Sequence, residues 1–252
     1  MQNELVQQIS VIDRDLAQLV TPWLDDQVKS GTAHLAADRV LIPLVAFTVQ
    51  GQTDLVAAQT WLARQAQISP EKIVELIYQL APVVGLPKVL ATLNVIHQVF
   101  RANQVTVKPG ATVQPDDYGA QVQSELYGNE IKNLLAELPE GAGDYISNAL
   151  TQHFFNDFYC RGFLTVAERE KFELLALITL NVDFQVRAHA RGSLKAGNSE
   201  AELVWSVIQL LPYIGFPLVI NSVRQIHQAA VTLQTEAAAE TNPTASGAAD
   251  EH

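Results

Sequence analysis

Cysteine is almost missing from this sequence, because Cys160 is the only one among 252 residues. A single thiol excludes an intrachain disulfide, and it excludes the paired cysteines of thiol–disulfide enzymes. The sequence also lacks a zinc-type cluster of Cys and His, a Gly-x-Ser-x-Gly elbow and a glycine-rich phosphate loop between a strand and a helix. His153 and Asp157 would share a helix face, but two ligands are too few for most metals. We therefore expect no metal and no cofactor, and we expect Cys160 to be structural.

Positive charge is scarce as well: 16 Lys and Arg stand against 27 Asp and Glu, which gives a net charge of −11. Phosphate contacts need Lys and Arg, so we expect no nucleic acid as a partner. No apolar run approaches the roughly 20 residues of a membrane span. The N-terminus, MQNELVQQIS, lacks the charged and apolar regions of a signal peptide. We expect no membrane partner and a cytoplasmic location.

Apolar residues, by contrast, are plentiful: 48% of the chain is hydrophobic, which is enough for a substantial core. Strand-like alternation between turn signals is missing, whereas helix start and stop signals recur. Thr165 and Glu168 fit a capping box, and Ser199 opens a second one. Asp183 fits a helix N-cap, and Gly197 fits a left-handed helix end. The predicted fold class is all-α.

The chain repeats itself at an offset of 130 residues without a gap. The matched positions are Pro82 with Pro212, Gly85 with Gly215, Pro87 with Pro217, and His97 with His227. A tandem duplication of one helical domain explains this most simply. We predict an N-terminal repeat over residues 1–104, a linker over 105–120, a C-terminal repeat over 121–236 and a disordered tail over 237–252. These two repeats are called the first half and the second half below.

His189 and Glu170 are the residues in the second half that could carry chemistry. They fall on consecutive predicted helices joined by a short loop, so the helices should pack antiparallel. Their heights along the helices then differ by roughly 9 Å at the α-helical rise, so they could meet directly or through a water. A structural interpretation remains open at this point: Glu170 would interact with a helix dipole, and His189 would be a satisfied interior residue.

The second half resembles the carboxymuconolactone decarboxylase family, which includes the alkylhydroperoxidase D-type proteins. The residues that carry this resemblance are Tyr159, Arg161, Leu164, Arg169, Glu170, His189, Gly192, Leu194, Gly197, Tyr213, Gly215, Phe216, Pro217 and Asn221. The resemblance implies the alkylhydroperoxidase D-like helical fold. The peroxidase-like members carry Cys-x-x-Cys where this sequence has Val182 and Gln185, so thiol peroxidase activity is not expected.

The resemblance also implies a decarboxylase acting on a small carboxylated, lactone-like substrate. His189 would be the acid/base group, and Glu170 would orient its imidazole. Arg187 or Arg191 would bind a substrate carboxylate, because a guanidinium binds carboxylates bidentately. Three aromatic residues would line the pocket, although each could equally belong to the core: Trp205, Tyr213 and Phe216.

A second interpretation is that the chain is a catalytically degenerate member that acts as an oligomeric binding or structural protein. At the offset of 130, the first half has Val40, Ala57 and Gln59 where the second half has Glu170, Arg187 and His189. The scaffold therefore persists without the site. The resemblance further implies a homo-oligomer, namely a trimer whose six halves form a pseudo-hexameric ring.

Overall fold

The computed structural model describes residues 4–241, and this part of the chain is largely helical. Within it, the β-structure is limited to an isolated bridge between Thr112 and Arg161. The predicted all-α fold class is confirmed. None of the helices in the described range is both long and apolar enough to cross a bilayer.

The first half contains the helices that precede the linker. They are α1 (Glu4–Ile12), α2 (Arg14–Lys29), the 3-10 helix η1 (Ala37–Leu41), α3 (Ile42–Gln50), α4 (Thr53–Gln65), α5 (Pro70–Gln79), α6 (Ala81–Val84) and α7 (Leu86–Ala102).

The second half follows the linker and includes the long terminal helix α15. Its elements are α8 (Tyr118–Tyr127), α9 (Glu130–Leu134), the 3-10 helix η2 (Pro139–Gly141), α10 (Ala142–Ala149), the π-helix η3 (Leu150–Tyr159), α11 (Val166–Leu180), α12 (Asp183–Lys195), α13 (Glu200–Gln209), α14 (Leu211–Ile214) and α15 (Phe216–Thr241).

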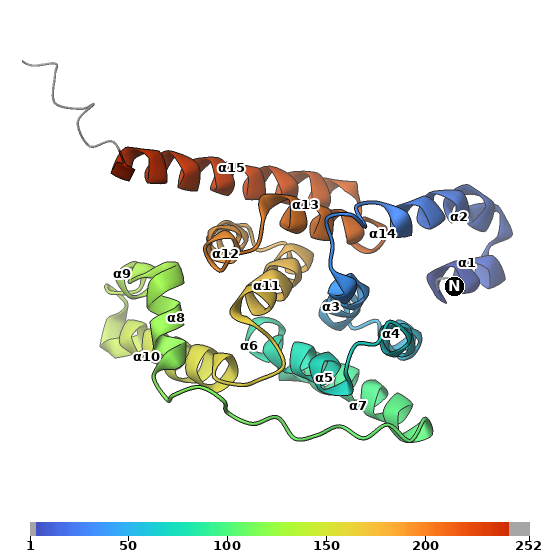
Figure 1. Cartoon of the computed structure of the whole chain (residues 1–252), viewed down its shortest axis with the longest axis horizontal. Helices are drawn as coiled ribbons and strands as arrows, with labels where there is room; N and C mark the ends of the chain where they lie inside the picture. Colours follow the sequence, from blue (N-terminus) through green and yellow to red (C-terminus); the bar gives the residue numbers. More distant parts are fainter. Residues whose placement is uncertain (1–3, 242–252) are drawn as a thin grey trace, which may run out of the picture.

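The duplication is visible in where the helices start. Helices α12, α13, α14 and α15 each begin 130 residues after α4, α5, α6 and α7. In Figure 1, α1 to α4 lie on the right, α8 to α10 lie on the left, and α15 crosses the top. Helix α11 packs against α3, α5 and α6 of the first half and against α12 of its own half, so one hydrophobic core runs through both halves.

The helix ends follow the predicted signals with two corrections. Thr165 and Glu168 form the predicted capping box. The second box is incomplete: Ser199 accepts from the Glu202 amide, but the Glu202 carboxylate accepts from Lys171 at 2.8 Å instead of returning to the cap. Helix α12 begins one residue earlier than predicted, with Val182 as its N-cap and Asp183 in the first turn.

The linker and the tail also differ at their edges from the predicted ranges. The linker runs along the bottom of Figure 1, and helix α8 already begins at Tyr118 within it. Helix α15 continues to Thr241, so residues 237–241, which were expected in the disordered tail, are helical. The remaining tail positions, 242–252, lie outside the described residues.

Candidate functional site

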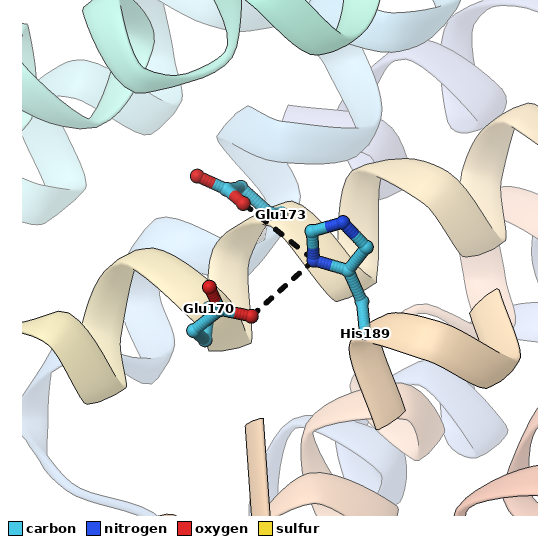
Figure 2. Close-up of side chains that lie close together, drawn as sticks. All are labelled: Glu170, Glu173 and His189. Atoms are coloured by element: carbon cyan, nitrogen blue, oxygen red, sulfur yellow. Dashed lines mark ion pairs between the residues drawn. The ribbon is translucent and has the colours of Figure 1, made fainter. Parts of the chain in front are cut away.

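Glu170 and His189 meet between α11 and α12. The Nδ1 atom of His189 lies 3.3 Å from Glu170 Oε2 and 3.6 Å from Glu173 Oε2 (Figure 2). Both carboxylates are fully buried, whereas the His189 side chain keeps 13% of its surface exposed. Two carboxylates thus face the same nitrogen of one partly accessible imidazole.

Two tyrosine hydroxyls complete this cluster. Tyr127 donates to Glu170 Oε2, and its oxygen lies 3.0 Å from His189 Nδ1. Tyr159 donates to Glu170 Oε1 at 2.6 Å and lies 3.1 Å from both oxygens of Glu173. The acceptors around Nδ1 favour a proton on that nitrogen. The other ring nitrogen, Nε2, lies on the far side of the ring from the carboxylates in Figure 2. We call these five residues the buried cluster: Tyr127, Tyr159, Glu170, Glu173 and His189.

Gly192 makes room for the tyrosine in this cluster. It lies on α12, nearly one turn after His189. A Cβ atom at this position would lie 2.3 Å from the Tyr127 hydroxyl and 2.9 Å from Glu170 Oε2. Both distances are shorter than real carbon contacts, so any side chain here would displace Tyr127 or Glu170. The sequence therefore encodes the position of Tyr127 partly through the absence of a side chain at residue 192.

Side chains of the first half make hydrogen bonds and ion pairs to the buried cluster and its neighbours. Gln79 on α5 donates its amide to Glu173 Oε1, and its own oxygen accepts from Arg169. Arg169 also donates to Glu75 Oε1 at 3.0 Å, and Glu75 forms a bidentate pair with Arg161. Because Glu75 and Gln79 belong to the first half, that half contributes directly to the surroundings of His189.

Burial decides the charge of the groups around the imidazole. Burial raises the pKa of Glu173 well above its ordinary value and is the largest cause of this shift. The charge of the neighbouring Glu170 raises the pKa of Glu173 further. Burial and then Glu170 also raise the pKa of Tyr127 and of Tyr159. Both tyrosines therefore remain neutral hydrogen-bond donors at ordinary pH, and Glu173 holds its proton more tightly than an exposed glutamate does.

The ligand atoms of Glu170, Glu173 and His189 lie within 4.8 Å of one another, which is close enough to hold a metal ion. Tyr127 and Tyr159 donate to the two oxygens of Glu170, and Gln79 donates to Glu173 Oε1. Tyr159 has a single hydroxyl proton, so Glu173 Oε2, at 3.1 Å from the Tyr159 oxygen, has no donor of its own among the described residues. Hydrogen bonds therefore satisfy three of the four carboxylate oxygens without a cation. The expectation that the protein binds no metal stays a prediction.

His189 lines a pocket of about 760 Å³. The pocket lies between α8, α9, α10 and η3 on one side and α11 and α12 on the other. Its lining is mainly apolar and includes Val83, Ile131, Leu134, Leu135, Ile146, Leu150, Phe154, Phe155, Leu177, Leu180, Val182 and Phe184. The buried cluster therefore meets a space that a substrate could occupy.

The structure does not bring the three predicted aromatic residues to this pocket. Trp205 stacks on His34 at 5.8 Å, and Tyr213 packs edge-on against Phe47 at 5.1 Å. Phe216 is exposed beside Trp23. All three contact aromatic rings of the first half, because the helices that carry them pack against the first half and not against α8. None of the three lines the His189 pocket.

The two predicted arginines also lie outside this pocket. Arg187 is exposed and pairs with Asp183 one turn earlier, and Arg191 pairs with Glu130 on α9. Both arginines line a second, open hollow of about 1210 Å³ between α9, α12 and α15. The helical phase explains this: residues 187 and 191 share a face, whereas residue 189 points elsewhere.

Comparison with known proteins identifies the family. Residues 15–98 and 146–228 each match the Carboxymuconolactone decarboxylase family, and together they cover more than half of the chain. The chain belongs to this family. Among curated proteins, none matches the chain with statistical significance. The two matched segments fit two fused copies of the carboxymuconolactone decarboxylase domain, as the sequence repeat predicted.

Sequence reasoning missed several residues of this candidate site. Glu173 could have been found, because it lies three residues after Glu170 and so shares its helix face. Tyr159 was noted for the family resemblance only, without a role. Tyr127 and Gln79 have no local signal, because they lie 62 residues before His189 and 94 residues before Glu173.

Two other residues singled out in the sequence lie apart from the site. Cys160 is buried, and its thiol donates to the Pro115 carbonyl at 3.3 Å. His153 pairs with Asp157 at 2.6 Å on an exposed face of η3. Neither residue lines the pocket of His189.

Proposed function

We propose that this protein is an acid/base enzyme of its family that decarboxylates a carboxylated substrate, with His189 as the proton carrier. The observation that carries the proposal is the placement of His189. Its Nδ1 is held by buried groups, while its ring lines an open pocket. An imidazole that changes charge near neutral pH suits proton transfer.

The chemistry assigned to each group follows from this placement. The bond between a substrate carbon and its carboxylate breaks, CO2 leaves, and the electron pair moves toward a conjugated carbonyl. A substrate carbon then takes a proton from Nε2 of protonated His189, while Nδ1–H keeps its bonds to Tyr127 and Glu170. Solvent returns the proton to Nε2.

Arg191 is the cation that we assign to a substrate carboxylate. Its present partner, Glu130, lines both the His189 pocket and the second hollow. A substrate carboxylate can therefore replace Glu130 on the guanidinium at the junction of the two spaces. Arg187 pairs with Asp183, and neither residue lines the His189 pocket, so Arg187 would act by charge alone.

The test compares His189→Gln with His153→Gln in a CO2-release assay on carboxymuconolactone and related carboxylated lactones. We expect the first variant to fold normally, because Gln59 occupies the equivalent position in the first half. Its rate should fall by about 10²–10⁴, the usual worth of general acid–base catalysis. The His153→Gln control should keep the wild-type rate. Equal rates in both variants would contradict the proposal.

A non-catalytic oligomer is the second candidate function, and one observation favours it. Leu86 and Leu90 on α7 are exposed, and so are Phe216 and Ile220 at the equivalent positions on α15. Exposed apolar residues that recur at the same places in both halves fit a repeated subunit contact.

We propose that these surfaces assemble the chain into a homo-oligomer, a trimer whose six halves form a ring. Light scattering should then give about three times the chain mass of 27.6 kDa. The double variant Leu90→Glu with Ile220→Glu should lower that mass. A monomeric wild type at micromolar concentration would contradict assembly without affecting the catalytic proposal.

A further inference from the structure

The His189 pocket is large and offers few cationic side chains to a ligand. Its volume is about 760 Å³, within the range of pockets that enclose drug-sized ligands. Among the described residues that line it, Lys132 is the only Lys or Arg, and Lys132 is exposed. A carboxylate placed among the apolar side chains away from His189 would lose its water without gaining a partner. The pocket favours an apolar body.

The second hollow has the opposite character. Arg187, Arg191, Arg224 and His227 all line it. Arg187 and Arg191 pair with acidic side chains, whereas Arg224 has no ion-pair partner among residues 4–241. Three arginines gather here although the chain carries a net charge of −11. Glu130 and Asp183 also line the hollow, and His227 pairs with Glu200. This hollow favours an anionic group.

The two spaces adjoin. Glu130, Leu134, Phe184 and Ala188 line both of them. Glu130 holds Arg191 at this junction, so a carboxylate already occupies the place that an anionic group of a ligand would take. One molecule can therefore have its apolar part beside His189 and its charged end among the arginines.

We propose that the ligand of this protein is an elongated amphipathic carboxylate, with an apolar chain in the His189 pocket and its carboxylate on Arg191 in place of Glu130. This inference rests on the proposed function only in taking the His189 pocket as the substrate site. It names a substrate class longer than a small lactone: an elongated molecule anchored by this carboxylate, with a second carboxyl group beside His189 that leaves as CO2.

Binding of simple probes tests the proposal without any turnover. Dodecanoate, hexanoate, dodecanol and dodecyl phosphate would be titrated below their aggregation concentrations by calorimetry. Dodecanoate should bind at least about a hundredfold more tightly than hexanoate, because it buries more methylene groups. The affinity for dodecanol should be lower than that for dodecanoate by about tenfold or more, because dodecanol lacks the charge. Binding of hexanoate or dodecanol as tight as that of dodecanoate would overturn the proposal, as would tighter binding of dodecyl phosphate or no saturable binding.

Two variants at the junction should act in opposite directions. Arg191→Gln should weaken dodecanoate binding by about tenfold or more, because it removes the charged partner. Glu130→Gln should strengthen binding, because it removes the competing carboxylate. Arg101→Gln, an exposed arginine outside both hollows, should change nothing. A general loss of folding cannot strengthen binding, so shifts of both junction variants in the same direction would overturn the proposal. His189→Gln should still bind dodecanoate, which separates this test from the catalytic one.

Discussion

The two halves of the chain keep the same helix ends and differ in what those helices hold. Ser69 and Ser199 cap equivalent helices, and Gly85 and Gly215 both adopt positive φ before equivalent helices. At the site the halves diverge: Gln59 replaces His189, and its amide donates to the Val40 backbone carbonyl at 2.6 Å. The same pair of positions is in contact in both halves, but only the second half places ionisable groups there. The comparison teaches that the scaffold does not need the buried cluster in order to fold.

The helix that carries the two carboxylates also differs. Helix α11 is continuous from Val166 to Leu180, whereas the first half has η1 followed by α3. Pro43 occupies the position equivalent to Glu173. Proline lacks an N–H and is best accommodated in the first turn of a helix, which fits the start of α3 at Ile42. The first half therefore lacks both the carboxylates and the long helix that aligns them.

The largest expected effect concerns the ion pairs that join the halves. Glu168 of the second half pairs with Lys72 of the first half. At the offset of 130 these positions correspond to Asp38 and Glu202, which are both acidic. Lys171 bridges these two carboxylates at 2.9 and 2.8 Å. Lys171→Met should destabilise the fold by about 3–5 kcal/mol, because it leaves the buried Asp38 carboxylate unpaired beside the partly exposed Glu202. Denaturant unfolding would measure the loss.

Adding Glu202→Lys to Lys171→Met should restore much of that stability. It recreates, on this side, the acid–lysine pair that Glu168 and Lys72 make on the other. Glu202→Lys alone, which places two lysines beside Asp38, is the matched control and should be less stable than the double variant. Equal stability of the single Lys171→Met and the double variant would show that the two contacts are not equivalent.

The next effect tests the space beside Tyr127. Gly192→Ala should destabilise the protein by roughly 1–3 kcal/mol, the usual cost of overpacking. It should also lower turnover, because the new methyl group displaces Tyr127 or Glu170 from the imidazole. Gly162→Ala is the control, since its added carbon would meet only ordinary contacts at 3.6 Å. Full activity in Gly192→Ala would mean that Tyr127 does not act on His189.

The smallest expected effect is a change in how the melting temperature depends on pH. The pKa of Glu173 is raised in the folded state above its ordinary value of 4.5. The folded protein therefore holds this proton more tightly than the unfolded chain, and the stability so gained is lost as pH rises through the raised pKa. Glu173→Gln stays neutral, so its melting temperature should fall less than that of the wild type between about pH 5 and 8.

Glu137→Gln, at an exposed position on the surface, is the control for this pH series and should follow the wild type. The raised pKa values of Tyr127 and Tyr159 act in the same direction but start from 10.0, above this range. Parallel melting curves for the wild type and Glu173→Gln would contradict a retained proton on the carboxylate pair.

The features that the sequence predicted are those that depend on neighbouring residues. The capping box at Thr165 and the left-handed turn at Gly197 follow from local chemistry. The contact of Glu170 with His189 follows from two helices and a short loop. Tyr127 could not be predicted, because α8 reaches the imidazole only through tertiary packing. Trp205 was misplaced for the same reason: the sequence shows an aromatic residue on a helix but not which neighbour that helix packs against.

The fit of Tyr127 against Gly192 also has an evolutionary consequence. In the first half the equivalent of Gly192 is Leu62, which carries a side chain where the second half has none. A lineage can lose such a site by a single substitution. To regain it, the first half would need Val40→Glu, Gln59→His and Leu62→Gly together. No single step among these restores a working group, so selection has nothing to favour until all are present. The difference between the two halves is therefore hard to reverse. A first half that lacks these residues cannot regain a site by one substitution, and it keeps the role of supporting the second half.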